Sequence, residues 1–534
     1  MERNKGETIG IMKNNKGITL LALAVTIVVL LILTSIGIKL ALGNNGIIGE
    51  AKNAKEQAEI DEEKGIVKRA TTVSLIKSKG SKVEQDTLEK ALSDEAGEGK
   101  TEVSDVGDTF EVVFIDSNRY YEVDSDGNIS DVNKIIKDEY AGDVTKGGKC
   151  DGSEEKPYEI SCIEDLLSFS NMVNGSGIKL DNGKATEITQ TTNFEGKSVV
   201  LKKSLNFKSK YSYDDYSRTD FGNINGDDTD GNMLITEMTT GTGFIPIGQY
   251  NSEFRGVFDG NGNSISNIYI NSSKESVAVF GCITRDVQIK NLCVQGQIEA
   301  TNNTRTSGLI GGAHDGNIVI KNCINKIKVN GNGSAQMGGF IANCWGATIT
   351  MINCANIGDV TSLGKGHIGG FCGTSESDFY IYNCCNIGEI KMASNGNIGG
   401  AIGFAWSKKI EIENFYNLGN IGGGGKKSGI LANILNATIS LKNAYNLGKV
   451  DGGAFCGNGA TEENLSIENS YYWKDTAEVA VYNKEDSIYG VNKVLDKISN
   501  QKLIEFLNDN IKTENANEWK KWQIENDKYI LPTM

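Results

Sequence analysis

Few residues in this chain of 534 residues have the types and spacing that catalysis requires. There are two histidines, His314 and His367, and they occupy different positions in the repeats described below. The sequence contains no His-Glu-x-x-His zinc motif, no Gly-x-Ser-x-Gly nucleophile turn and no phosphate-binding loop. Asp259 could imitate the carboxylate of a glycan-cleaving enzyme, but such enzymes need several acids, or acids with Arg and Lys, on one wall. We therefore expect a protein that is not an enzyme.

Two acidic segments could bind a cation, and both have a simpler interpretation. The segment Asp124–Asn128 begins like a calcium loop, but position twelve counted from Asp124 is Ile135 rather than the bidentate glutamate of an EF-hand. We therefore expect an ordinary turn that closes a strand. The acids in Asp227–Asp230 lie in a polar insertion, residues 208–242, where a solvated loop is expected. The sequence thus predicts neither a bound metal nor an organic cofactor.

The composition excludes some classes of partner and fold. A formal net charge of −15 argues against a nucleic-acid partner, because affinity for phosphates comes from Lys and Arg. Sixty-four glycines against three prolines favour a β structure dense in turns. Eleven cysteines in so long a chain do not make a disulfide framework, although Cys150 and Cys162 are close enough in sequence to form a bond. The length predicts several units rather than one core.

The stretch from Ile265 to Asn469 carries a repeat in which two apolar residues at alternate positions precede an asparagine. The anchor asparagines are separated by 24 to 31 residues. A near-constant period of this length predicts a solenoid. The anchors are Asn267, Asn291, Asn322, Asn353, Asn383, Asn414, Asn443 and Asn469.

Each repeat should contribute a strand whose asparagine points inward, because the asparagine falls in phase with the alternating apolar residues. Stacked coils would place successive asparagines about 4.8 Å apart, where side-chain amides can form a ladder of hydrogen bonds. Cys323, Cys354 and Cys384 each follow an anchor, and we interpret them as small packing residues rather than metal or redox groups. The outward residues show no repeated aromatic or charged row, so the pattern identifies no binding face.

A second motif repeats with the same period. It contains paired glycines, as in Gly308–Gly311 and in Ile368-Gly-Gly-Phe371, which let neighbouring coils approach closely. Together with Asn353-Cys-Ala-Asn-Ile-Gly358, Asn383-Cys-Cys-Asn-Ile-Gly388 and similar segments, this stretch resembles the GLUG-repeat family. The resemblance covers roughly residues 244–472 and implies a parallel β-helix.

An apolar segment near the amino end predicts a membrane anchor. Residues 18–38 carry no charge, and as a helix they would span roughly 31 Å, enough for a bilayer core. Lysines precede the segment and a long acidic chain follows it, which places the amino end inside the cell and the bulk outside. A cleaved secretory signal is the alternative, but the run is too long for one and lacks a clear cleavage site.

The residues Lys16-Gly17-Ile18-Thr19-Leu20 resemble the processing site of type IV pilins and pseudopilins. The resemblance covers about residues 13–78 and implies that a prepilin peptidase cuts between Gly17 and Ile18, that the new terminus is methylated, and that other pilin-like subunits are partners. The fifth mature position is Ala22, where this family usually has a glutamate that pairs with a neighbouring subunit's amine. Ala22 therefore favours a minor or tip component, or simple anchoring, over a major pilin.

The predicted fold class is mainly β, a parallel β-helix preceded by a long pilin-like helix and a small α+β headpiece. The headpiece should contain a short helix over residues 86–92 and a hairpin over residues 110–123. Its preceding helix should pack through Ala54, Ala58, Val67, Ala70 and Ile76. The expected units are a leader (1–17), a transmembrane and amphipathic helix (18–78), the α+β unit (79–140), the β-helix (150–472) with a helical cap at residues 161–173, and a C-terminal cap over its open end (473–534).

These features predict a membrane-anchored, pilin-like bacterial surface protein that displays an extracellular β-helix for adhesion or as a surface rod. The repeat type and the Lys- and Asn-rich composition favour a Gram-positive source. The expected partners are the membrane, through the N-terminal helix, and a host or glycan surface. One alternative is a minor pilin or pseudopilin of a type IV pilus or type II secretion-like machine. A second is a β-helix carbohydrate-active enzyme.

Overall fold

The computed structural model divides the chain into two compact units, Met1–Ile135 and Ile136–Met534. Each has its own apolar core. The structure describes residues 47–534 except 80–81, 106–108, 115–116, 118, 131–132, 135–141, 182–183, 208–242, 302–304, 334, 407, 486–493, 513–514, 516–517, 526–528 and 533–534.

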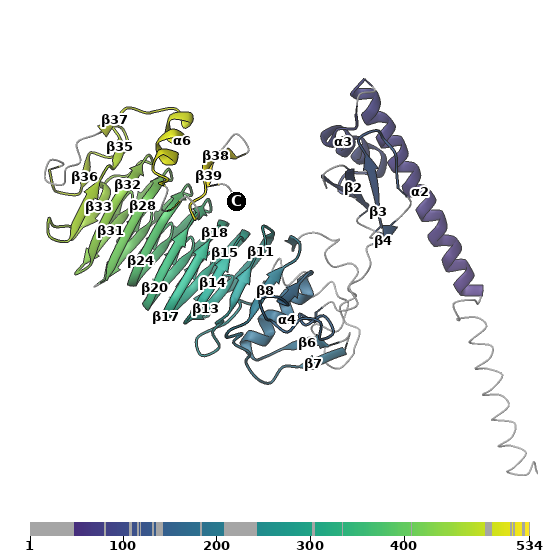
Figure 1. The fold of residues 1–534 in the computed structure, drawn as a ribbon, viewed down its shortest axis with the longest axis horizontal. Coiled ribbons are helices and arrows are strands. Elements are labelled where there is room, and N and C mark those ends of the chain that lie inside the picture. The colour runs from purple at the N-terminus through teal and green to yellow at the C-terminus, as the bar shows by residue number, and fades with distance from the viewer. Residues whose placement is uncertain are drawn as a thin grey trace, which may run out of the picture. The chain divides into compact units, whose positions relative to one another are not determined.

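The first unit packs two helices on a small antiparallel sheet (Figure 1). The helices are α2 (Ile47–Lys77) and α3 (Gln85–Ala96), and the strands are β1 (Thr101–Asp105), β2 (Thr109–Phe114), β3 (Arg119–Asp124) and β4 (Asn133–Lys134), in the order β1-β2-β3-β4. The β2 and β3 strands pair antiparallel, with Thr109 opposite Asp124. The predicted short helix and hairpin are therefore present, each within a few residues of its expected bounds.

The face that α2 packs inward differs from the predicted stripe. Val67 and Ala70 are buried as expected, together with Glu63 and Ser74, which lie on the same face at helical spacing. Ala58 is exposed and Ile76 is 71% exposed, so both were wrong as packing positions.

None of the helices in the described part of the chain combines the length and the apolar character that a membrane-spanning helix needs. The predicted membrane segment, with Gly17, Ile18 and Ala22, lies outside the described residues.

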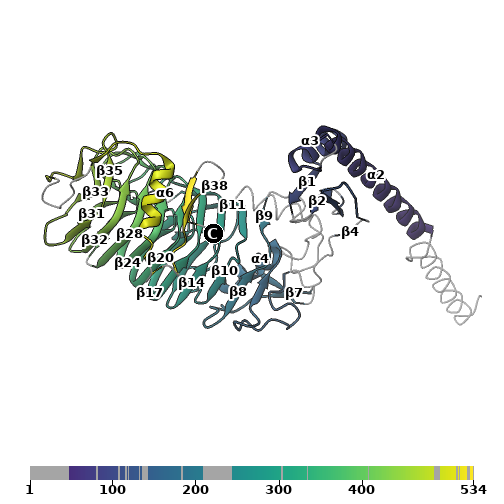
Figure 2. The same ribbon diagram turned by 45° about the horizontal axis from the view of Figure 1, so that its top comes forward.

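The second unit begins with a helical cap. Its elements are β5 (Tyr158–Ile160), α4 (Ile163–Asn174), β6 (Ile178–Asp181) and β7 (Lys184–Glu187). The α4 helix buries Leu166, Phe169 and Val173, and the Phe169 ring packs edge-on against Phe194 and Phe254. The α4 helix covers the first coil at the amino end of the solenoid (Figures 1 and 2), as the sequence predicts for residues 161–173.

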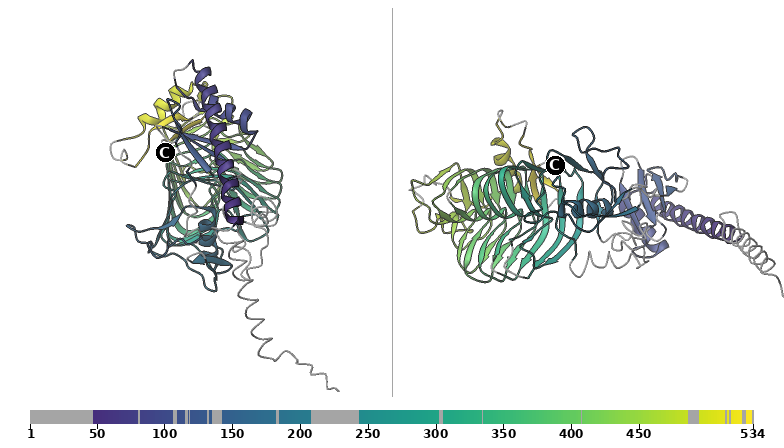
Figure 3. Two further views of the ribbon diagram at one scale, coloured as in Figure 1. Left: turned by 90° about the vertical axis from the view of Figure 1, so that its right-hand side faces the viewer. Right: turned by 90° about the horizontal axis from the view of Figure 1, so that it is seen from below.

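The solenoid is built from parallel strands that stack along one axis as successive rungs (Figure 3). One stack is β8 (Ser198–Leu201), β10 (Val257–Asp259), β14 (Val287–Lys290), β17 (Ile310–Lys321), β20 (Ile341–Ile352), β24 (Cys372–Asn386), β28 (Lys409–Asn417), β32 (Thr438–Asn446) and β34 (Leu465–Glu468). The next is β9 (Leu205–Asn206), β11 (Ser264–Ser272), β15 (Cys293–Ala300), β18 (Ile324–Gly331), β22 (Val360–Ser362), β25 (Ile390–Met392) and β29 (Ile421–Gly423), with β21 (Ala355–Asn356) beside β18.

Two further stacks meet at a corner of each coil. The first is β12 (Ser276–Val277), β16 (Arg305–Ser307), β19 (Ala335–Gly338), β23 (Gly366–Gly369), β26 (Gly396–Gly399), β30 (Lys426–Ser428) and β33 (Gly453–Asn458). The second runs from β13 (Phe280–Thr284) through the first halves of β17, β20 and β24 to β27 (Ile402–Trp406) and β31 (Leu431–Leu435).

The apolar residues of the repeat fill the inside of the coils. Ile289 pairs in register with Ile320, and Ile320 with Met351. The row continues through Ile381 to Ile412, and all five side chains are fully buried. Because equivalent side chains from successive coils stack on each other, the core is continuous along the axis. The prediction of a mainly β chain with a parallel β-helix is confirmed.

The C-terminal residues lie along the side of the solenoid rather than over its open end. The coils continue beyond residue 472 through β35 (Tyr471–Trp473), β36 (Val479–Val481) and β37 (Val494–Leu495). The chain then forms α6 (Asn500–Asp509) and the hairpin of β38 (Trp522–Glu525) and β39 (Tyr529–Pro532). These elements bury an outward row of the coils, including Ala355, Cys385 and Tyr416, and form a lateral cover that is visible beside the strands in Figure 2.

Candidate functional site

The predicted asparagine ladder exists as a column of side-chain amides, which we call the outer column. The Nδ2 atom of Asn322 donates to Oδ1 of Asn291 at 2.8 Å, and Asn353 donates to Asn322 at 2.8 Å. The same bond joins Asn383 to Asn353 and Asn414 to Asn383. Each amide thus satisfies part of its hydrogen-bonding capacity with the coil before it.

The outer column is on the side of the coils and not in the apolar interior that the alternation predicts. Each anchor asparagine adopts a left-handed conformation, with φ of 54° at Asn322 and at Asn353. Asparagine tolerates this conformation better than most residues, and it turns the chain away from the strand direction. The C-terminal residues cover the column through hydrogen bonds. Asn353 donates to the carbonyl of Glu518, and Trp522 Nε1 donates to Asn383 at 2.6 Å.

The ends of the predicted ladder differ from its middle. Asp259, rather than Asn267, precedes Asn291 in the column, since its carboxylate accepts from Asn291 Nδ2 at 2.9 Å. Asn267 belongs to another turn and donates to Asn206. At the other end, Asn443 and Asn469 line a pocket with Tyr445, Tyr471, Phe506, Asp509 and Asn510. The carboxylate of Asp259, considered above as a possible catalytic acid, therefore has a structural role as the first acceptor of the outer column.

A second column, which we call the inner column, was not predicted. Its members are fully buried, and they follow the anchors by three residues. Asn356 Nδ2 donates to Asn386 Oδ1 at 2.7 Å, and Asn386 donates in turn to Asn417 at 2.7 Å. These bonds run toward the carboxyl end, opposite to those of the outer column. The inner column comprises Asn325, Asn356, Asn386, Asn417 and Asn446.

The paired-glycine motif makes room for the inner column. A Cβ atom on Gly370 would lie 2.3 Å from Oδ1 of Asn386 and 2.3 Å from the carbonyl oxygen of Gly400. Any side chain there would displace either the amide column or the next coil. The two repeated motifs of the sequence are therefore two halves of one packing arrangement.

Aromatic and basic side chains gather on the outside of the corner, although the sequence showed no repeated row. Outward residues of β16, β23 and β26 stand beside outward residues of β17, β20 and β27, and their side chains touch across the corner. The guanidinium of Arg305 lies 4.8 Å from the Trp345 ring, and His367 stacks on Phe404 with centroids 4.7 Å apart. We call this surface the aromatic corner; it comprises Arg305, His314, Trp345, His367, Phe404 and Trp406.

The aromatic corner combines one exposed ring and several half-buried rings with two buried polar atoms that have no partner within the described residues. Trp406 is 43% exposed and pairs in register with Leu435 of the next coil, which is 46% exposed. Asn343 and Thr374 lie in the row that leads to Phe404. Both are buried, and Asn343 Oδ1 and Thr374 Oγ1 accept or donate no hydrogen bond within the described residues. Rings beside unsatisfied polar groups are typical of a ligand-binding surface.

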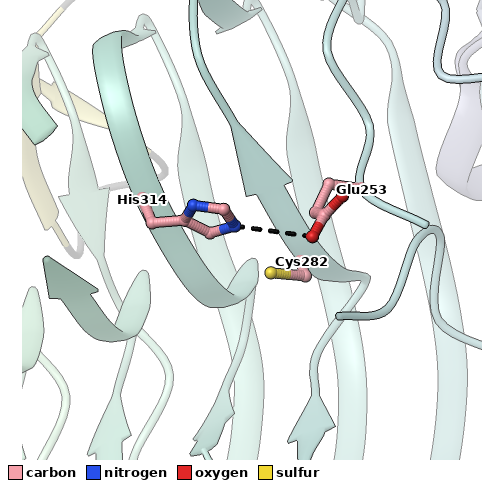
Figure 4. A group of neighbouring side chains, drawn as sticks. All are labelled: Glu253, Cys282 and His314. Carbon is pink, nitrogen blue, oxygen red and sulfur yellow. Dashed lines mark ion pairs between the residues drawn. The ribbon is translucent and has the colours of Figure 1, made fainter. Parts of the chain in front are cut away.

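At one end of the aromatic corner, three side chains point toward one another from successive parts of the coil (Figure 4). They are Glu253, Cys282 on β13 and His314 on β17, and one ligand atom of each lies within 4.8 Å of the other two. His314 Nε2 is 3.6 Å from Glu253 Oε1. The His314 ring also stacks on Trp345, with centroids 4.8 Å apart and planes 10° from parallel.

The surroundings of Cys282 favour its protonated thiol. Burial, helped by the Glu253 carboxylate, raises the pKa of its thiol to about 12, so the thiol stays protonated at neutral pH. None of the eleven cysteines, all of which lie in the described part of the chain, forms a disulfide bond, so Cys150 and Cys162 are not joined. Burial likewise holds the thiol pKa of Cys323 and Cys354 well above its ordinary value, in agreement with their interpretation as packing residues.

The other candidate residues from the sequence have structural roles or lie outside the described residues. The Asp124 carboxylate accepts hydrogen bonds from the backbone amides of Asp126 and Asn128, which is an ordinary turn. Hydrogen bonds from Asn128 lower the pKa of Asp124. The acids in Asp227–Asp230 are not among the described residues.

No protein-family model matches the chain, and no curated protein does. Among solved structures, the chain is similar to a Bacteroides ovatus protein provisionally named an immunoglobulin A1 protease. The sequence identity is 14% and the TM-score is 0.39, and the comparison covers 72% of this chain and 94% of that protein.

Proposed function

We propose that the chain is a membrane-anchored, pilin-like bacterial surface protein whose β-helix binds a glycan on its aromatic corner. The observation that carries the binding proposal is the arrangement of that corner, where Trp345, Phe404 and Trp406 stand beside unsatisfied polar atoms on a rigid wall. Flat apolar rings can cover the C–H faces of sugar rings, while amides and hydroxyls bond to the sugar hydroxyl groups.

Several features of the solenoid support a role as a rigid display rod. The core is continuous along the axis, the two amide columns bond each coil to the next, and the lateral cover shields the outer column. A structure of this kind holds a binding surface in one geometry and resists local opening, because each coil is supported by its neighbours. Display at a cell surface benefits from both properties.

The anchoring half of the proposal rests on the sequence. The uncharged run at residues 18–38 would form the membrane helix, and Lys16-Gly17-Ile18 would be the prepilin peptidase site. Mass spectrometry of the mature protein is expected to show an amino terminus at Ile18 that carries a methyl group. An amino terminus at Met1, or one created within residues 38–46, would contradict processing by a prepilin peptidase.

The binding half can be tested with the full-length protein in detergent on an array of bacterial and host glycans. Trp406→Ala should reduce binding to the recognised glycan at least tenfold, because a loss of about 1.4 kcal/mol of contact free energy changes Kd tenfold. Leu363→Ala is the matched control, because Leu363 is 60% exposed and is not part of the aromatic corner. Equal binding by both variants would place the ligand elsewhere.

The second candidate function is that of a minor pilin or pseudopilin, which Ala22 favours over a major pilin. Recovery of the protein in sheared filaments would support it, whereas strict retention in the membrane would support simple anchoring.

We propose no catalytic activity. Release of reducing or unsaturated sugars by the purified protein, abolished by substitutions in the aromatic corner, would overturn that view and identify a carbohydrate-active enzyme.

A further inference from the structure

The cluster of Glu253, Cys282 and His314 contains the donor atoms that zinc prefers, one sulfur, one imidazole nitrogen and one carboxylate oxygen. We propose that these three side chains bind a Zn²⁺ ion, with the fourth coordination position open to water or to a ligand in the aromatic corner. Nothing in the sequence pattern indicates this site, because the three residues come from unequal loops and strands.

The distances suit a zinc ion. Bonds of about 2.0–2.3 Å in a tetrahedral site place the ligand atoms about 3.3–3.8 Å from one another. His314 Nε2 and Glu253 Oε1 are already 3.6 Å apart, and all three ligand atoms lie within 4.8 Å of one another. Ligand atoms at the upper end of that range would have to approach by about 1 Å when an ion binds.

The surroundings hold His314 in the orientation that metal binding requires. Its Nδ1 atom lies 3.0 Å from the Asp315 carboxylate and 3.1 Å from Thr284 Oγ1. A proton held on Nδ1 by Asp315 leaves Nε2 with a lone pair directed at Glu253 and Cys282. Nε2 is buried and has no hydrogen-bond partner within the described residues. A buried nitrogen without a hydrogen-bond partner is available to bind a metal ion.

Glu253 is also oriented from outside the cluster. Its Oε1 accepts a hydrogen bond from the backbone amide of Asn251 at 2.8 Å, and its Oε2 lies 3.5 Å from Arg255. One carboxylate oxygen is thereby held beside His314, while the other contacts the guanidinium of Arg255. Carboxylates and imidazoles that bind metals are usually fixed by such outer partners.

The donor set argues for zinc rather than calcium or magnesium. Calcium takes six to eight oxygen ligands and magnesium requires a nearly octahedral set of oxygens, and a thiol and an imidazole supply neither. On binding, the Cys282 thiol would release its proton to solvent and bind as the thiolate. The negative charges of this thiolate and of Glu253 would together balance the two positive charges of the ion.

A bound ion would join three consecutive parts of the chain. Glu253 precedes β10, Cys282 lies on β13 and His314 lies on β17, so the metal would fix the first coils to one another. It would also fix the His314 ring that stacks on Trp345. The site would thereby stabilise one end of the aromatic corner.

The experiment uses the full-length protein, stripped with a chelator and titrated with Co²⁺ and Zn²⁺. Wild type should bind one Zn²⁺ per chain, and the Co²⁺ complex should show the sulfur-to-cobalt charge-transfer band of a thiolate ligand. Cys282→Ser should abolish that band. His314→Gln and Glu253→Gln should each weaken Zn²⁺ binding at least tenfold, because loss of an outer partner alone typically costs about 10–100-fold.

The matched control is Cys150→Ser, which removes a cysteine outside the cluster and should bind Zn²⁺ as wild type does. Asp315→Asn should weaken binding about tenfold while all three ligands remain. If the wild-type protein shows no cobalt band and no zinc, the cluster is a hydrogen-bonded packing group and the proposal is wrong. That titration needs no variant, so a variant that fails to fold does not leave the question open.

Discussion

Asn386 stands in the middle of the inner column, where its amide bonds to three partners. It accepts from Asn356 and donates to Asn417 and to the carbonyl of Gly388. Asn386→Ala leaves the Asn417 and Gly388 oxygens buried without a donor, and each such group costs about 1–3 kcal/mol. We therefore expect a loss of about 2–4 kcal/mol in the free energy of unfolding, measured by chemical denaturation.

Asn395→Ala is the control for that change. Asn395 is exposed and lies a few residues further along the same coil, so its replacement should alter the free energy of unfolding by less than about 0.5 kcal/mol. If the two variants unfold at the same denaturant concentration, the amide column does not stabilise the fold.

His367 makes the stability of the β-helix depend on pH. Burial, and then the charge of Lys426, lower its pKa below the ordinary value of 6.5. Between its lowered pKa and 6.5, the unfolded chain binds the proton and the folded chain does not. Stability should therefore fall as the pH drops through that window, by at most about 1.4 kcal/mol per pH unit for one proton.

The substitution that isolates this effect is His367→Asn. The next coil carries Asn397 at the equivalent position, in register with His367, so the coil geometry accommodates the amide. Below pH 6.5, the unfolding free energy of the variant should change less steeply with pH than that of the wild type. The difference corresponds to the uptake of one proton. An unchanged slope would assign the pH dependence to other groups.

Whether the sequence predicted the direction of a side chain correctly depended on the backbone conformation of the residue. Alternation with period two correctly placed Ile320 and Met351 inside the coils. It failed at Asn322 and Asn353 because their left-handed conformation turns the chain out of the strand phase. The inner column was visible as a second asparagine three residues after each anchor from Asn322 to Asn443, but only the packing of Gly370 on Asn386 explains it.

At the scale of elements, α2 is joined to β3 by a buried ion pair. Arg119 is 4% exposed, and its Nε and Nη2 atoms donate to Glu63 at 2.7 Å and 2.8 Å. Tyr121 donates to the same carboxylate at 3.1 Å. Glu63→Ala leaves the buried guanidinium with only the half-exposed Glu59 carboxylate, so it should destabilise the first unit by about 3–5 kcal/mol in thermal unfolding.

Glu59 offers the matched comparison, because it contacts the same Arg119 at 3.3 Å but has a side chain that is 45% exposed. A solvent-exposed ion pair contributes about 0–1 kcal/mol. Glu59→Ala should accordingly leave the melting temperature almost unchanged. Equal effects of the two substitutions would show that the pair with Glu63 is no stronger than the exposed one.

The lateral cover depends on Trp522, which is 2% exposed and donates to Asn383 of the outer column. Its ring also packs against Tyr416, with centroids 5.5 Å apart. Trp522→Ala removes both contacts, so limited proteolysis should cut the C-terminal segment at least tenfold faster while the coils remain intact. Trp406→Ala, which removes an exposed tryptophan from β27, should leave the cleavage rate unchanged.

The position of this cover could not be read from the sequence. The amphipathic stretch near Asn500 was recognisable as a helix, yet its apolar face fits either an open end or a wall of the solenoid. The choice is made by the outward row Ala355, Cys385 and Tyr416, which is apolar only where the cover lies. The aromatic corner escaped prediction for a similar reason, because its residues come from two strands that only the turn of each coil brings together.

At the scale of the whole molecule, the chain contains two units with separate apolar cores, one around Val67 and Leu88 and one inside the coils. Separate cores of this kind unfold as separate cooperative transitions. Calorimetry of the full-length protein should therefore show two transitions. Glu63→Ala should lower only the transition of the first unit, and Asn386→Ala only that of the β-helix.

The double variant decides whether the units are independent. Residues in separate cores with no shared partner have additive effects, within about 0.3–0.5 kcal/mol. Glu63→Ala combined with Asn386→Ala should thus reproduce both single shifts, each in its own transition. A merged transition, or a β-helix that melts earlier when only Glu63 is replaced, would show that the first unit supports the solenoid. The protein would then be one mechanical body and not a display rod carried by a separate anchoring unit.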